Sequence, residues 1–172
     1  MRKRILLLIL GVFSVIVVIF FILSSFGYKY SDEQSTIIKE LGRPDSFVLV
    51  FSTDEEGNNE RLETWNYHDC EFSVTFLNGI FSGADEIEPL PENAIPARHE
   101  PEQFESHMGW KDILDEIGHK PWMRASDTLP DLFSETDLEL YYSEQIVAGF
   151  DTKTNDLVYV KTMVLVPEES RE

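Results

Sequence analysis

The chain has 172 residues, of which 42% are hydrophobic, and it carries a formal net charge of -18 at pH 7. Such an acidic protein repels phosphate backbones at long range, which argues against nucleic acid as a partner and favours a basic protein, a cationic peptide or a divalent cation. The apolar fraction is high enough for a packed core, which argues against a disordered chain, and a single cysteine, Cys70, excludes an intrachain disulfide.

Residues 5–23, near the start of the chain, form an apolar segment without a charged residue. They follow Arg2-Lys3-Arg4. A helix of that length spans roughly 28 Å, close to the ~30 Å hydrocarbon core of a bilayer. We therefore predict a transmembrane anchor over residues 1–27 that contacts the membrane through residues 5–23. The basic start predicts a cytoplasmic N-terminus and an extracytoplasmic body, periplasmic or extracellular. A signal peptide is the alternative, since Ser25-Phe26-Gly27 is an acceptable cleavage site.

Residues 28–87 have the pattern of a helix followed by antiparallel strands. Ser31 or Asp32 can cap the helix at its start, and Gly42 followed by Pro44 ends it. Apolar runs and alternating patterns then predict four strands, the last of which follows a hairpin. These strands are expected at residues 47–51, 61–67 and 70–77 and, after Asn78-Gly79, from residue 80.

Residues 88–101 contain four of the eight prolines and fit no regular structure. This composition predicts an extended linker. The alternative is a loop that lies on the first unit through Leu90 and Ile95.

Residues 102–167 form a second predicted unit, before a charged tail over residues 168–172. Its helix carries apolar residues at i, i+3, i+4 and i+7 and ends at Gly118, before Pro121. The apolar positions are Trp110, Ile113, Leu114 and Ile117. Strands are expected at residues 138–142, 146–150 and 157–166.

The two units also resemble each other in sequence. A shift of 76 residues superposes residues 37–42 on residues 113–118, and Glu63-Thr64-Trp65 on Glu139-Leu140-Tyr141. We therefore predict an internal repeat. The expected fold class is α+β: an N-terminal transmembrane helix followed by two small units, each a helix packed on an antiparallel sheet. Units of about 60 residues are marginally stable alone, so the two are expected to pack together.

Three segments of the first unit carry a family resemblance: Leu41-Gly42-Arg43-Pro44-Asp45, Trp65-Asn66-Tyr67, and residues 72–79, Phe-Ser-Val-Thr-Phe-Leu-Asn-Gly. Their order resembles the helix-plus-sheet module of the β-lactamase inhibitor proteins and of the small lipoproteins of bacterial outer-membrane assembly. The second unit departs from it, with Tyr141-Tyr142-Ser143 in place of Trp-x-Tyr, and no lipid-bearing cysteine follows the apolar segment. The resemblance implies a non-enzymatic scaffold that binds another protein across its sheet, and it carries over no catalytic residue.

No pattern in the chain predicts catalysis, a metal site or a cofactor. His68 and Cys70 could share a strand face, but no second pair of ligands completes a zinc site, and Cys70 is expected to be a small buried residue. The loop over residues 151–156 has Lys153 at a ligand position of a calcium loop and lacks the closing Glu. We expect no enzyme. A hydrolase built on the many carboxylates is the least favoured alternative.

The predicted function is a membrane-anchored, extracytoplasmic module of the cell envelope that binds another protein. The alternative is an acidic inhibitor or immunity protein that neutralises a basic toxin or enzyme. Aromatic side chains are the candidate anchors, because such residues dominate interface energies. They are Trp65, Tyr67, Trp110, Trp122, Tyr141 and Tyr142. About half of them are expected in the core, since large aromatics are mostly buried.

Overall fold

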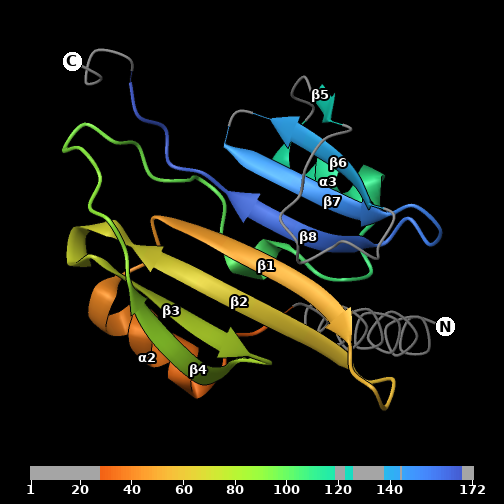
Figure 1. Cartoon of the computed structure of the whole chain (residues 1–172), viewed down its shortest axis with the longest axis horizontal. Helices are drawn as coiled ribbons and strands as arrows, with labels where there is room; N and C mark the ends of the chain where they lie inside the picture. Colours follow the sequence, from red (N-terminus) through yellow and green to blue (C-terminus); the bar gives the residue numbers. More distant parts are fainter. Residues whose placement is uncertain (1–27, 119–122, 126–137, 144, 168–172) are drawn as a thin grey trace, which may run out of the picture.

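The computed structural model describes residues 28–118, 123–125, 138–143 and 145–167. Within these residues, eight strands form one antiparallel sheet in the order β4-β3-β2-β1-β8-β7-β6-β5 (Figure 1). Each strand therefore pairs with its sequence neighbour, except where β1 meets β8.

The first half of the sheet follows helix α2. Ser31 caps this helix by accepting a hydrogen bond from the backbone N–H of Gln34, and Gly42 ends it with a φ of 88°. A short 3-10 turn, η1, separates β2 from β3. The elements are α2 (Asp32–Leu41), β1 (Ser46–Thr53), β2 (Asn59–Tyr67), η1 (His68–Cys70), β3 (Phe72–Leu77) and β4 (Ile80–Glu86).

The turn η1 corrects the prediction for Cys70. Residues 68–70 wind into a 3-10 turn and Glu71 adopts a left-handed conformation with a φ of 59°. The alternation of the third strand therefore begins at Phe72. Cys70 lies outside the strand and is exposed, rather than buried as predicted.

The second half contains helix α3 and the remaining strands. Gly118 ends α3 with a φ of 85°, as Gly42 ends α2. The elements are η2 (Pro101–Gln103), α3 (Trp110–Ile117), β5 (Met123–Ala125), β6 (Leu138–Ser143), β7 (Ile146–Asp151) and β8 (Leu157–Thr162).

A single sheet replaces the two separate units predicted from the sequence. Strands β1 and β8 pair directly, from Val48 opposite Lys161 to Val50 opposite Tyr159. The prediction that each helix packs on its own small sheet is therefore wrong. The physical reason is that β1 is apolar on both faces, so it is more stable between two strands than at an edge exposed to water.

The predicted single-pass topology also needs correction. Residues 5–23, on which it rested, lie outside the described residues. In the part of the chain that the structure describes, no helix is long and apolar enough to cross a membrane. A span needs about 20 apolar residues, whereas α2 has 10 residues and α3 has 8. The structure therefore does not support a single-pass membrane protein with an extracytoplasmic body.

Both helices pack on the same face of the sheet. Ile38 of α2 and Ile113 and Ile117 of α3 join one core cluster with Phe47 and Trp65 of the sheet. This core extends through both halves of the chain. The opposite face, which we call the open face, is covered by neither α2 nor α3.

The segment predicted as a linker runs between the two halves and contacts both. The N–H of Ala97 donates to the carbonyl of Asp45 at 2.7 Å, beside β1. Ile95 forms an isolated antiparallel bridge with Leu165, beyond the end of β8. The side-chain amide of Gln145 donates to the carbonyl of Pro96 at 3.0 Å. Ile95 therefore packs beside the second half rather than on the first.

Candidate functional site

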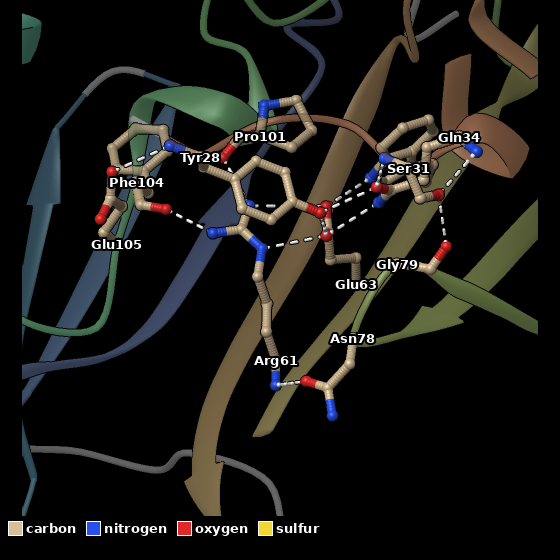
Figure 2. A network of polar contacts seen from close by, with 11 residues as sticks. Tyr28, Ser31, Gln34, Arg61, Glu63, Asn78, Gly79, Pro101, Phe104 and Glu105 are labelled. Atoms are coloured by element: carbon tan, nitrogen blue, oxygen red, sulfur yellow. Dashed lines mark hydrogen bonds and ion pairs between the residues drawn. The ribbon is translucent and has the colours of Figure 1, made fainter. Parts of the chain in front are cut away.

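A network of buried polar side chains lies on the helix-covered face of β2. Because side chains alternate along a strand, Arg61, Glu63 and Trp65 all point to this face. Glu63 is 0% exposed and Arg61 is 8% exposed. Their ion pair joins Nε of Arg61 to Oε1 of Glu63 at 2.9 Å (Figure 2).

The carboxylate of Glu63 accepts hydrogen bonds from four side chains. In addition to Arg61, the donors are Nε2 of Gln34 at 2.9 Å, Nε1 of Trp65 at 3.1 Å and the hydroxyl of Tyr28. Burial raises the pKa of Tyr28, and its hydrogen bond to the Glu63 carboxylate raises this pKa further, so Tyr28 remains a donor at neutral pH. The carboxylate is therefore saturated by groups of the protein itself.

Arg61 is equally occupied. Its guanidinium donates to the backbone carbonyls of Phe104 and Pro101, the latter at 2.7 Å. The ring of Tyr28 lies over it, with 3.8 Å between the Arg61 Cζ and the ring centroid (Figure 2). A catalytic acid or base needs access to a substrate. Glu63 and Arg61 are buried and fully bonded within the protein, and their network joins α2, β2 and η2.

An acidic hollow lies beside α3. It has a volume of 490 Å³, and Glu102, Glu105, Asp112 and Glu116 supply its carboxylates. Three of them are already engaged. Asp112 accepts from the N–H of Gly109, Glu116 accepts from the Gln103 amide, and Glu105 accepts from the N–H of Tyr28. Among the described residues, no group of three or more His, Cys, Asp or Glu could hold a metal ion. The hollow contributes negative potential rather than a defined site.

A second hollow, of 390 Å³, lies where β1 and β8 separate. Phe51 and Thr53 line one side, and Asp151 and Leu157 line the other. The carboxylate of Asp151 accepts hydrogen bonds from the backbone N–H groups of Thr154 and Lys153 in the turn that follows it. These bonds hold the pKa of Asp151 below its usual range. This carboxylate is therefore engaged by the backbone of its own turn.

The open face is left without a helical layer by α2 and α3. The strand register places its side chains in two parallel rows across the sheet. One row is mainly apolar: Ile80, Leu77, Leu62, Val50, Tyr159 and Leu140. The other row mixes hydroxyl, apolar and basic side chains: Thr75, Thr64, Val48, Lys161, Val147 and Tyr142.

The two halves of the open face differ in exposure. Leu140, Val147 and Tyr159 are at most 8% exposed and form a second apolar cluster. In the first half, Leu77 is 38% exposed and Ile80 is 65% exposed. The first half thus presents aliphatic and hydroxyl side chains to solvent.

The predicted aromatic anchors lie in three different settings. Trp65 and Tyr67 are 0% and 4% exposed in the helix-side core, where they cannot reach a partner. Trp110 and Tyr141 are half-buried against the same core, with ring centroids 4.2 Å apart. Tyr142 lies on the open face. Trp122 lies outside the described residues.

The surface residues that sequence reasoning missed are Leu62, Thr64, Leu77 and Ile80. A signal for them was present, since Leu62 and Thr64 alternate with the aromatic positions of the same strand. The pattern separates the two faces but does not say which face the helices cover.

Comparisons with family models, with curated proteins and with solved structures found no match to the chain.

Proposed function

We propose that the protein is a non-enzymatic module that binds a basic partner protein across the open face of its sheet. The observation that carries the proposal is the one-sided arrangement of the fold. Both helices cover one face, and half-buried Val48, Val50, Leu62 and Thr64 line the other. A rigid sheet with small and aliphatic side chains offers a flat, preformed contact surface at low entropic cost.

The charge distribution supports a basic partner. The formal net charge is -18, and two carboxylates, Glu60 and Asp85, flank the open face at β2 and β4. Complementary charge at the rim of an interface accelerates association and discriminates among partners, while the apolar centre supplies affinity. An inhibitor or immunity role is the special case in which the partner is a basic enzyme or toxin.

Cross-linking from defined positions tests this proposal. A photoreactive residue at Thr64 samples the open face, and the same residue at Ser35 samples the exposed side of α2, on the other layer. We expect a cross-linked protein of basic composition from position 64 but not from position 35. Equal yields from the two positions would show contact without a defined face.

Affinity for the captured protein then provides the decisive measurement. Thr64→Arg places a positive charge on the open face and should weaken binding at least tenfold, about 1.4 kcal/mol. Ser35→Arg, with the same change in charge, should bind as the parent does. Salt of about 1 M, with a Debye length of about 3 Å, should weaken the parent complex. Binding indifferent to both Thr64→Arg and salt would contradict the proposal.

A further inference from the structure

Strand β4 forms one edge of the sheet and is unusually exposed. Its one neighbour is β3, to which the two-residue Asn78-Gly79 turn connects it. Ile80 and Phe81, which begin the strand, are 65% and 51% exposed. An exposed edge strand offers unpaired backbone groups on which another strand can add.

The register shows which backbone groups of β4 point away from the sheet. The N–H of Ile87 donates to the carbonyl of Glu71 at 3.0 Å, and the same register pairs Phe72 with Glu86 and Val74 with Ala84. Hydrogen-bonded and non-hydrogen-bonded pairs alternate along an antiparallel ladder. The N–H and C=O groups of Ala84 and Glu86 therefore face outward.

The two ends of this edge are treated differently. At its start the N–H of Phe81 also faces outward, but the carboxylate of Glu33 in α2 accepts its hydrogen bond. Among the described residues, nothing bonds in this way to the outward groups of Ala84 and Glu86. Glu33 of α2 thus satisfies the outward N–H of Phe81 at the start of the edge, whereas the outward groups of the last residues of the strand stay open.

The charges along the edge select among possible occupants. No Lys or Arg occurs between Arg61 and Arg98, and Asp85 and Glu86 are exposed on the two faces of β4. A second copy of this chain would bring these carboxylates against each other, which is destabilising for like charges on adjacent strands. A basic segment would meet opposite charges on both faces.

The geometry points to β4 as the place where an extended, basic segment of the partner adds as a further strand of the sheet. The segment would exchange backbone hydrogen bonds with Ala84 and Glu86 and place lysine or arginine beside Asp85 and Glu86. Main-chain bonds would supply affinity and side-chain charge would supply specificity, as in strand addition generally. The inference rests on the proposed function and names how the partner attaches.

A competing interpretation is that the charges and the register shift near Phe76 only protect the edge against aggregation. The test uses the full chain labelled with ¹⁵N and a peptide of Lys-Lys-Thr-Thr repeats, about ten residues long, which places lysine on both faces of a strand. We expect the peptide to bind and the amides of Ala84 and Glu86 to gain protection from hydrogen exchange, while the amide of Phe81 does not change. An edge that is only protected against aggregation would show no binding.

Two variants separate backbone from charge effects. Ala84→Pro removes an outward N–H without removing a bond of the β3–β4 ladder, because proline is tolerated at such edge positions. It should weaken peptide binding at least tenfold. Asp85→Lys/Glu86→Lys reverses the charges of the edge and should also weaken peptide binding at least tenfold. It provides the test if Ala84→Pro does not fold. The matched control is Glu55→Lys/Glu56→Lys in the exposed β1–β2 loop, which should bind as the parent does.

Several outcomes would overturn the inference. Equal weakening by the β4 and loop double variants would show non-specific attraction. A concentration-dependent dimer that disappears in Ala84→Pro would assign the edge to a second copy of the chain. Protection from hydrogen exchange that the peptide induces only in residues of the open face would also overturn the inference. Cross-linking from position 64 does not depend on β4, so the edge inference can fail while the proposed function stands.

Discussion

At the scale of single residues, Glu63 shows how a buried charge is tolerated. Four side-chain donors surround it, from the N-terminal segment, α2 and β2. A buried ion pair adds little net stability compared with apolar residues, but removing one partner leaves an uncompensated charge. The buried ion pair therefore contributes specificity for this fold. The two charges are satisfied only when Tyr28, Gln34 and the carbonyls of Pro101 and Phe104 converge on them.

Arg61→Met tests this interpretation. The variant leaves Glu63 buried without its cationic partner and should lower the free energy of unfolding by about 3–5 kcal/mol. Arg61→Met/Glu63→Gln removes the charge as well and should recover part of that loss. Urea denaturation measures both. A single variant within about 1 kcal/mol of the parent would mean that solvent reaches the carboxylate.

At the scale of elements, the β3–β4 hairpin is attached to the start of α2. The hydroxyl of Ser31, which caps α2, donates to the carbonyl of Gly79 in the turn. Gly79 has a φ of 79°, and a Cβ at this position would lie 3.1 Å from Cβ of Ser31 and 3.3 Å from Oε1 of Gln34. The turn residue therefore serves both the hairpin and the helix cap.

Gly79→Ala should destabilise the protein for two reasons, and Gly57→Ala provides the matched control. Gly57 has a φ of 87°, and no atom lies within 4 Å of the place that a Cβ would take, so alanine there adds only backbone strain, about 1 kcal/mol. Gly79→Ala adds crowding of the cap and should cost more than Gly57→Ala. Urea unfolding of both variants gives the difference. Equal losses would show that Ser31 and Gln34 move aside freely.

At the scale of the whole molecule, one sheet and one helix-side core join the two halves. Tyrosines at several points of this structure ionise with difficulty. Burial is the main cause that raises the pKa of Tyr28, Tyr30 and Tyr67, with smaller contributions from Glu63, Glu102 and Asp45, respectively. Losing these protons therefore favours the unfolded chain.

This predicts an alkaline limit to stability. The folded-state pKa of each tyrosine lies above its unfolded value of about 10. The contribution of the protonated tyrosine to the free energy of unfolding is therefore complete below about pH 10 and declines as the pH rises further. Each such group can lower the free energy of unfolding by up to about 1.4 kcal/mol per pH unit. Urea denaturation between about pH 8 and pH 11, with phenolate absorbance of the folded protein, checks this. Ionisation of all tyrosines near pH 10 in a fully folded protein would contradict it.

The sequence by itself determined the local features of this protein. The helix end at Gly42, the helix end at Gly118 and the Asn78-Gly79 hairpin are confirmed. Each depends on the conformational preferences of a few adjacent residues. The alternation along residues 61–67 likewise separated Trp65 from Leu62 correctly.

Only the tertiary structure decided how these features combine. The pairing of Val48 with Lys161 joins residues far apart in the chain, and local preferences do not specify it. That pairing made one sheet of two expected units and placed both helices on one face. It therefore also decided that Trp65 lies in the core and that Leu62 and Thr64 lie on the open face. The physical reason is that burial depends on which surfaces meet, whereas a strand pattern specifies only that two faces differ.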